Sequence, residues 1–545
     1  MRTVTIIVTD EFGNVTNDPQ KHTYQLDLET EGFDGIEKAV INFKNKMLPD
    51  LQGQLLEEEQ EEFIKKKPDS LRCNGTAPIT IKTLNGSFPF KNQRFLENNC
   101  DQTSHTYLEL TNQFEDGHTS EGLKEFSAYY ANRLSYEETE ELIERTSGKK
   151  QLSDQSIQTT VVNKALEVSK QVESEAKKVL EDDALGLPEI NKEVDIYDVD
   201  TKEVLILVDG IGVKKQSESR SRSEEARVDT ESDTKNAGSR VNSNIVLLEK
   251  KAGDFEYITS AIDNEGEELL PLSDIVKSKV IKEYGDDEEP VNMVSISDGA
   301  KDIRSLLMNV FGIVIVIILD WYHLCKKVRE FMSMIARNKQ EKVEHIEFLL
   351  YHLWHGQTQE VLDYLNNKVD AKNEDKLQKL IGYIEKHQEE IIDYDRRKKA
   401  GKEVGSEDDD VDNQPVSKVQ AFKKADSVEN ACDNIIKRCG KHKEVSLDQE
   451  DIDSDVQNQS SSVQIVKKVG SGRVEKGCDS VIGKRQKHKA MSWSKLGSRS
   501  LAILKVVELN NKWLDIWFPP PIAANDLQRA ANDPYESGEL DLVAA

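Results

Sequence analysis

The order of strand-like and helix-like runs between residues 201 and 330 constrains the fold more than any other feature of the sequence. The runs follow one another as strand, strand, strand, helix, strand, helix and strand. The strand-like runs are apolar and rich in Val and Ile, whereas the other two carry apolar residues at helical spacing. Strands that alternate with helices predict a sheet with helices on its faces. We therefore predict an α/β fold with a mixed sheet for this part of the chain.

The last of these strands, in the stretch VIVIILDWYHL, leads from apolar residues directly into Asp320 and His323. Burying a carboxylate and an imidazole costs free energy unless the two groups are paired or have a function. The apolar run Leu306–Leu319 is shorter than the roughly 20 residues that cross a bilayer, so we expect no membrane segment. The N-terminus lacks the layout of a signal peptide, and six scattered cysteines without a CxxC pair are typical of a reducing cytosol.

Two of the predicted strands carry an aspartate followed by glycine, Asp209 in VDG and Asp298 in SDG. Adjacent strands lie about 5 Å apart, so we expect the two carboxylates to reach one site. Glu475 is the best third acid, because at helical spacing it falls at the edge of the apolar arc of its own segment. Three such carboxylates suit two Mg²⁺ or Mn²⁺ ions about 4 Å apart, which support phosphodiester transfer.

The segment around Glu475 is basic, although the whole chain has a net charge of −28. Residues 461–517 hold 12 Lys and Arg against 4 Asp and Glu, whereas residues 406–460 hold 7 against 14. Basic side chains interleaved with an aromatic residue are typical of DNA-binding groups. The predicted DNA-binding residues are Arg473, Lys476, Lys484, Arg485, Lys487, Lys489 and Trp493. An amphipathic helix with a solvated basic face and an incidental glutamate is the alternative interpretation.

The N-terminal part of the chain predicts a hairpin and then a pair of helices. The pair Asn85-Gly86 is a hairpin signal. Ser135 begins a capping box and Ser153 is an expected N-cap, with Gly148 in the short turn between the two helices. This spacing is that of a helix-turn-helix, whose second helix enters a DNA groove. An ordinary helical hairpin that packs into its own core is the alternative, and this segment alone favours it.

Six segments resemble bacterial insertion-sequence transposases of the Kra type, which belong with the Mutator-like DDE transposases. They are LSYEETEELIERTSGKKQLSDQSIQ, VDGIGVK, SDGA, LDWYHL, IIDYDRRKKAGKEVGS and GSGRVEKGCDSVIGKRQKHKAMSWSKLGSRSLAILKVVELNNKW. Together they span most of residues 120–518 in order. The last block is long and specific, whereas VDG or SDGA alone carries little weight.

The resemblance implies a ribonuclease-H-like mixed-sheet core with a large helical insertion and a helical N-terminal DNA-binding region. It implies Asp209, Asp298 and Glu475 as the catalytic residues and as the ligands of two Mg²⁺ or Mn²⁺ ions. Asp320 and His323 match a C/D-x-x-H motif and are implied to be accessory residues. A rival assignment makes Asp320 the second metal ligand in place of Asp298.

The implied function is that of a transposase, which binds the terminal inverted repeats of its element, cleaves DNA and joins the ends to target DNA. The resemblance further implies a homo-oligomer on DNA, in the bacterial cytoplasm with the nucleoid. One departure is that GKEVGS and GSGRVEK are separated by 63 residues, Glu407–Val469, which contain a degenerate copy of the last block around Glu429. Two alternatives therefore stay open: a catalytically inactive DNA-binding relative, and a ribonuclease-H-fold nuclease without strand transfer.

The predicted organisation follows these changes in pattern along the chain. The expected parts are an N-terminal strand and helix region (1–118), a helix-turn-helix-like region (119–195), the first part of the core (196–325), a helical insertion (326–405), a polar inserted segment (406–469), the catalytic helix with its basic region (470–520) and a tail (521–545). The polar segment is too poor in apolar residues to form a core of its own.

Overall fold

The computed structural model describes residues 2–9, 12–13, 15, 23–26, 32–97, 100–111, 114, 117–182, 184–216, 240–287, 289–312, 315–404, 472–488 and 491–519. The predicted polar segment 406–469, the tail 521–545, and the residues Glu429 and Lys489 lie outside this range. The chain divides into two compact units. Unit 1 comprises Met1–Pro188, Gly210–Asp286 and Gly477–Ala545, and unit 2 comprises Glu189–Asp209 and Asp287–Lys476. No helix within the described ranges is long and apolar enough to cross a membrane.

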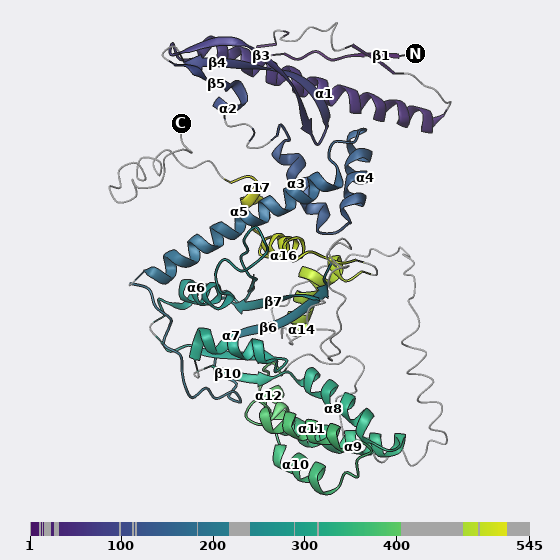
Figure 1. Ribbon diagram of the computed structural model, residues 1–545, viewed down its shortest axis with the longest axis vertical. Helices are drawn as coiled ribbons and strands as arrows, with labels where there is room; N and C mark the ends of the chain where they lie inside the picture. The colour runs from purple at the N-terminus through teal and green to yellow at the C-terminus, as the bar shows by residue number, and fades with distance from the viewer. Residues whose placement is uncertain are drawn as a thin grey trace, which may run out of the picture. The chain divides into compact units, whose positions relative to one another are not determined.

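The N-terminal part of unit 1 is a long helix packed on a three-stranded antiparallel sheet (Figure 1). The elements are β1 (Arg2–Thr5), β2 (Thr23–Leu26), α1 (Phe33–Lys66), β3 (Leu71–Thr83), β4 (Gly86–Glu97), β5 (Cys100–Thr106) and α2 (Tyr107–Leu110). The predicted hairpin is present, but its turn residues are Leu84 and Asn85, because Thr83 pairs with Gly86. Gly86 has φ 133°, and a Cβ there would lie 2.6 Å from Cγ of Pro49 in α1. Glycine is therefore required where α1 crosses the turn.

Three helices follow in unit 1, and the last two begin where their caps were predicted. They are α3 (Glu121–Ala131), α4 (Tyr136–Ser147) and α5 (Asp154–Glu181). Ser135 and Glu138 form the reciprocal capping box, and Ser153 accepts a hydrogen bond from the amide of Ser156. Gly148 ends α4 in the left-handed conformation, with φ 76°. The apolar face of α5 packs on α3, α4, α6 and α16, so this helix contributes to the core of unit 1; its predicted role in DNA binding stays a prediction.

The predicted order of strands and helices is confirmed, and the sheet that it forms is mixed. The elements are β6 (Glu203–Lys214), β7 (Arg240–Glu249), β8 (Phe255–Ile258), α6 (Leu272–Tyr284), β9 (Asn292–Ser297), α7 (Lys301–Phe311) and β10 (Val316–Leu319). The strand order is β10-β9-β6-β7-β8. In unit 2, β10, β9 and the first half of β6 are parallel, whereas β7 and β8 in unit 1 are antiparallel. The boundary between the units falls inside β6, after Asp209.

The chain after β10 is helical, as expected for residues 326–405. The helices are α8 (Trp321–Ile335), α9 (Lys339–Trp354), α10 (Thr358–Asn367), α11 (Glu374–Lys386) and α12 (Tyr394–Lys399). The last predicted strand ends before Asp320, because Asp320 accepts a hydrogen bond from the amide of His323 and begins α8.

The C-terminal elements are α14 (Gly472–Cys478), a π-helical turn (Asp479–Gly483), α15 (Lys484–Gln486), α16 (Lys495–Leu509) and α17 (Trp513–Trp517). The helix predicted to start near Arg473 is therefore present. Its period widens after Cys478, and the sequence pattern gave no sign of this change.

A buried ion pair fastens the end of the helical insertion to the start of β6 within unit 2. The side chain of Arg397 in α12 is fully buried, and its guanidinium donates to both carboxylate oxygens of Glu203, at 2.9 and 2.7 Å. It also donates to the carbonyl of Ile196 at 2.9 Å, and Lys402 donates to Glu203 at 2.8 Å. Bidentate pairing with additional carbonyl acceptors offsets the cost of removing these charges from water.

We predict that Arg397→Met lowers the free energy of unfolding by about 3 kcal/mol, because it leaves Glu203 buried with one partner fewer. Lys399→Met is the matched control, since Lys399 lies on the same helix and its side chain is 75% exposed in its pair with Asp395. That substitution should cost less than about 1 kcal/mol. Urea denaturation followed by circular dichroism measures both, and equal effects would contradict the structural role of Arg397.

Candidate functional site

The candidate site lies in unit 2, where three parallel strands lead into aspartates at one level of the sheet. Val208 of β6 and Leu319 of β10 both pair with Ser297 of β9. An aspartate directly follows each of these three residues. Asp209 follows Val208, Asp298 follows Ser297, and Asp320 follows Leu319. The parallel register therefore brings three carboxylates to one level of the sheet, two directly after the ends of β9 and β10 and one within β6.

Five charged or titratable side chains line one small hollow, which we call the carboxylate pocket. They are Asp209, Asp298, Asp320, His323 and Glu475. The other walls are Val208, Ile296, Ser297 and Val474. The cavity measures about 10 Å³, which is close to the room that a single water occupies. A hollow of this size suits small ions, whereas an organic substrate would have to lie at its mouth.

Asp320 and His323 form one structural unit because of their spacing. Asp320 is buried and is the N-cap of α8, and its Oδ2 accepts from the backbone N–H of His323 at 3.2 Å. The same oxygen lies 2.6 Å from Nδ1 of the His323 ring. A D-x-x-H sequence at a helix start thus joins an N-cap to a ring hydrogen bond, which fixes the imidazole in one orientation.

The other ring nitrogen of His323 faces Glu475. The distance from Nε2 to Oε1 of Glu475 is 3.5 Å. Side-chain ligand atoms of Asp320, His323 and Glu475 all lie within 4.8 Å of one another. The residues predicted as catalytic, Asp209, Asp298 and Glu475, line the same pocket, and their roles stay a prediction.

The charges in the carboxylate pocket shift the pKa of two of its members. Burial lowers the pKa of His323, but the hydrogen bond and charge of Asp320, with the charges of Glu475 and Asp298, outweigh it and raise the pKa. Burial raises the pKa of Glu475, and the charges of Asp320 and Asp209 raise it further against the opposing effect of His323. The pocket therefore holds more negative charge than its own cationic groups neutralise.

Glu475 reaches the pocket from α14, whose apolar side is buried. Val474 and Cys478 are buried, as the predicted arc requires, and the side chain of Glu475 is 35% exposed at the edge of that arc. The π-helical turn follows directly after Cys478. Such turns occur frequently next to functional sites, because they change the direction of side chains along one helix.

The predicted DNA-binding residues divide into exposed and buried ones. Lys476, Lys484 and Lys487 are exposed, and Arg473 is half-buried. The prediction is wrong for Arg485 and Trp493, which are both buried.

The burial of Arg485 has a clear physical reason. Its Nε donates to the carbonyl of Ala131 at the end of α3, at 2.7 Å, and its guanidinium lies 4.9 Å from the ring of Trp493. Trp493 in turn donates from Nε1 to the carbonyl of Gln486 at 3.0 Å. A helix C-terminus and an aromatic ring attract a guanidinium, and sequence spacing alone does not reveal that they surround it.

Residues of the helical insertion that the sequence did not suggest lie against the pocket. His387 is buried beside Glu390, and Glu390 also pairs with Arg304 at 2.8 Å. A Cβ added to Gly299, the residue after Asp298, would lie 2.9 Å from Cε1 of His387. The only signal in the sequence is the H-x-x-E spacing of His387 and Glu390, which is too common to identify a site.

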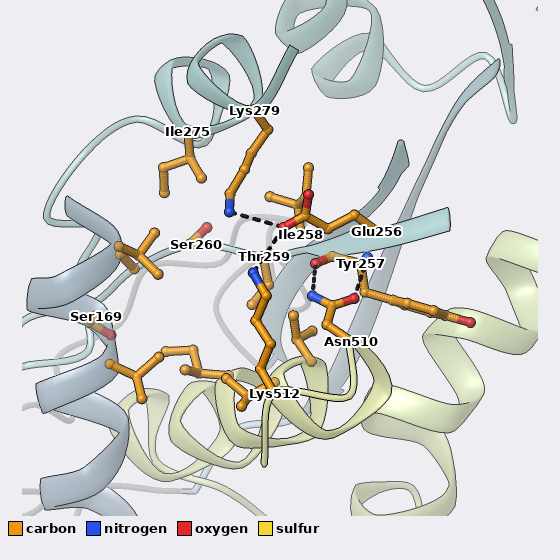
Figure 2. A pocket seen from close by; sticks show the side chains of 16 residues that line it. Ser169, Glu256, Tyr257, Ile258, Thr259, Ser260, Ile275, Lys279, Asn510 and Lys512 are labelled. Carbon is orange, nitrogen blue, oxygen red and sulfur yellow. Dashed lines mark hydrogen bonds and ion pairs between the residues drawn. The ribbon is translucent and has the colours of Figure 1, made fainter. Parts of the chain in front are cut away.

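A second pocket, in unit 1, has a different character (Figure 2). It measures about 90 Å³ and is lined by side chains from α5, α6, β8 and α16. Glu256 pairs there with Lys279 at 2.9 Å and with Lys512 at 3.8 Å. The side-chain amide of Asn510 exchanges two hydrogen bonds of 2.8 Å with the backbone of Tyr257, and so covers β8, the last strand of the sheet. The polar groups of this second pocket are satisfied by one another. The carboxylate pocket is therefore the better candidate for chemistry.

We predict that His323 stabilises the metal-free protein more at low pH than at high pH. Its folded pKa is raised, so its contribution is complete below the unfolded pKa of about 6.5 and is lost as the pH rises through the folded pKa. His323→Gln should therefore reduce the free energy of unfolding more at about pH 5.5 than at about pH 8.5, as measured by urea denaturation in EDTA.

The control for this prediction is the same substitution in an Asp320→Asn background. Removing the Asp320 charge should shrink the pH-dependent part of the effect, since that residue contributes the strongest attraction to the imidazolium. An effect of equal size at both pH values in the parent background would contradict the pairing.

Comparison of the chain with family models and with curated proteins finds no match. The function of the carboxylate pocket must therefore be inferred from its geometry and from the sequence patterns that led to it.

Proposed function

We propose that this chain is a DDE transposase, a metal-dependent enzyme that cleaves DNA strands and joins them to a target. One observation carries the proposal: aspartates from neighbouring parallel strands and Glu475 from a distant helix line a single small pocket. Asp209, Asp298 and Glu475, the three residues of the expected triad, all line this pocket, which supports the proposal. The order of the strands, with β6 between β9 and β7, supports a ribonuclease-H-like core as part of this proposal.

The residues of the carboxylate pocket fit hard divalent cations. Carboxylate oxygens predominate, as Mg²⁺ and Mn²⁺ prefer, and the pocket lacks thiolates among the residues that line it. Burial raises the pKa of Glu475, and the charges of Asp320 and Asp209 add to this effect. A cation bound beside Glu475 would favour its charged carboxylate. Asp209, Asp298 and Glu475 would hold the ions. When bound, two such ions activate the attacking oxygen and stabilise the leaving oxygen of a phosphodiester.

Asp320 and His323 are proposed to orient Glu475. Oδ2 of Asp320 already accepts from the amide and the ring of His323, which favours a structural role over metal ligation for this carboxylate. His323 then directs Nε2 towards Glu475 and attracts its carboxylate. We therefore keep Asp298 as the second metal ligand in this proposal, whereas the group of ligand atoms within 4.8 Å of one another contains Asp320 and favours the rival assignment.

We expect Asp209→Asn, Asp298→Asn and Glu475→Gln each to reduce DNA cleavage more than about a hundredfold. Each substitution removes a ligand of the metal ions, which stabilise the transition state by several kcal/mol. Asp320→Asn should reduce cleavage less, because asparagine still caps α8. The measurement is a strand-cleavage and joining assay with Mg²⁺, on DNA that carries the inverted repeats flanking the reading frame.

The matched control for that assay is Asp302→Asn, which removes an exposed carboxylate from the first turn of α7 and should leave cleavage unchanged. Cleavage without joining would identify a nuclease, and DNA binding without cleavage would identify an inactive relative. Full activity of Asp209→Asn or Glu475→Gln would refute the triad.

A separate prediction concerns DNA binding by the exposed lysines. Lys484→Ala and Lys487→Ala should each weaken DNA binding uniformly across sequences and reduce the slope of log K against log salt by about 0.9, the value for one phosphate contact. Arg485→Met should instead lower thermal stability, because Arg485 is buried in unit 1. Filter binding at several salt concentrations, with melting temperatures of the same variants, tests this division.

A further inference from the structure

The helical insertion contributes a buried hydroxyl that has no hydrogen-bond partner. The hydroxyl oxygen of Tyr383, in α11, is inaccessible to solvent and unpaired. Its ring lies 4.7 Å from the ring of His387, the residue that packs against Gly299. An unpaired buried hydroxyl costs folding free energy, so its position calls for a partner that functions in another state of the protein.

Three carboxylates act electrostatically on this hydroxyl. Burial raises the pKa of Tyr383, and the charges of Asp298, Glu390 and Asp320 raise it further. The hydroxyl therefore remains protonated at neutral pH and can only donate a hydrogen bond to these groups.

Two of the three carboxylates are already engaged. Glu390 pairs through one oxygen with His387 and through the other with Arg304. Oδ2 of Asp320 accepts twice from His323.

The charge of Asp298 has the strongest effect of the three on Tyr383. Its Oδ1 accepts from the amide of Ala300 at 2.8 Å.

The backbone beside Asp298 is held tightly against the helical insertion. Gly299 has φ +75°, and a Cβ there would lie 2.8 Å from Leu319 and 2.9 Å from His387. This contact fixes the Asp298–Gly299 turn next to the end of α11.

We propose that Tyr383 is a positioning residue for Asp298, whose carboxylate accepts a hydrogen bond from the Tyr383 hydroxyl when it holds a divalent cation. The inference rests on the proposed metal site. Carboxylates that ligate metals are themselves hydrogen-bonded by a second layer of residues, which orients them and tunes their affinity. The helical insertion would thus supply a second-layer hydrogen bond to one of the metal ligands.

The test compares Mn²⁺ binding and metal-free stability of the full chain and its Tyr383→Phe variant. We expect about tenfold weaker Mn²⁺ binding by calorimetry, the effect typical of losing such a second-layer group. The melting temperature in EDTA should be unchanged or higher, because phenylalanine removes an unpaired buried hydroxyl without changing the shape of the ring.

Tyr364→Phe is the matched control. Its hydroxyl lies in the same insertion and is paired with Nδ1 of His345 at 2.8 Å. This substitution should lower the melting temperature in EDTA and leave Mn²⁺ binding unchanged. In an Asp298→Asn background, Tyr383→Phe should have no further effect on Mn²⁺ binding, since the two residues act through one hydrogen bond.

Three results would overturn the inference. Unchanged Mn²⁺ binding by Tyr383→Phe in a parent that binds Mn²⁺ would remove the role of Tyr383 and leave the proposed metal site intact. A drop in its metal-free melting temperature as large as that of Tyr364→Phe would mean that the hydroxyl is already paired. A parent chain that binds no Mn²⁺ would overturn both the metal site and the role of Tyr383.

Discussion

Electrostatic repulsion among carboxylates on neighbouring parallel strands is the constraint on which the site depends. In-register strands about 5 Å apart bring Asp209, Asp298 and Asp320 to one edge of a sheet, where their negative charges oppose one another. The protein engages Asp320 as a helix cap and pairs it with His323. The physical basis for inferring a cation site is that four carboxylates, Asp209, Asp298, Asp320 and Glu475, line one pocket with a single imidazole.

The helical insertion is more than a spacer between the strands and Glu475. Its last helix is fastened to the beginning of β6 by the buried pair of Arg397 and Glu203. Its fourth helix ends at His387, which packs against the turn after Asp298. One contact is to β6, which carries Asp209, and the other is to the residue after Asp298. The insertion therefore restrains the backbone next to these two aspartates.

Charge at the C-terminal end of the chain has two distinct uses. Lys484 and Lys487 are exposed and available to phosphates, whereas Arg485 between them is enclosed by Trp493 and the end of α3. Neighbouring basic residues therefore lie in different environments, the lysines exposed to solvent and the arginine within unit 1. A helical wheel cannot distinguish the buried arginine from the exposed lysines. Burial of an arginine depends on which carbonyl and which aromatic ring the tertiary fold places next to it.

Much of the fold followed from local physical chemistry in the sequence. Apolar runs, caps such as Ser135 and Ser153, and the Gly148 turn determine their elements through contacts within a few residues, so their positions were predictable. The same holds for the strand order along the chain and for the apolar arc beside Glu475. The tertiary structure alone decided that Asp320 and His323 share the pocket with Glu475, that Arg485 and Trp493 are buried, and that Tyr383 packs against His387. These outcomes depend on strand register and on helix packing between distant segments, and such contacts leave no periodic trace in the sequence.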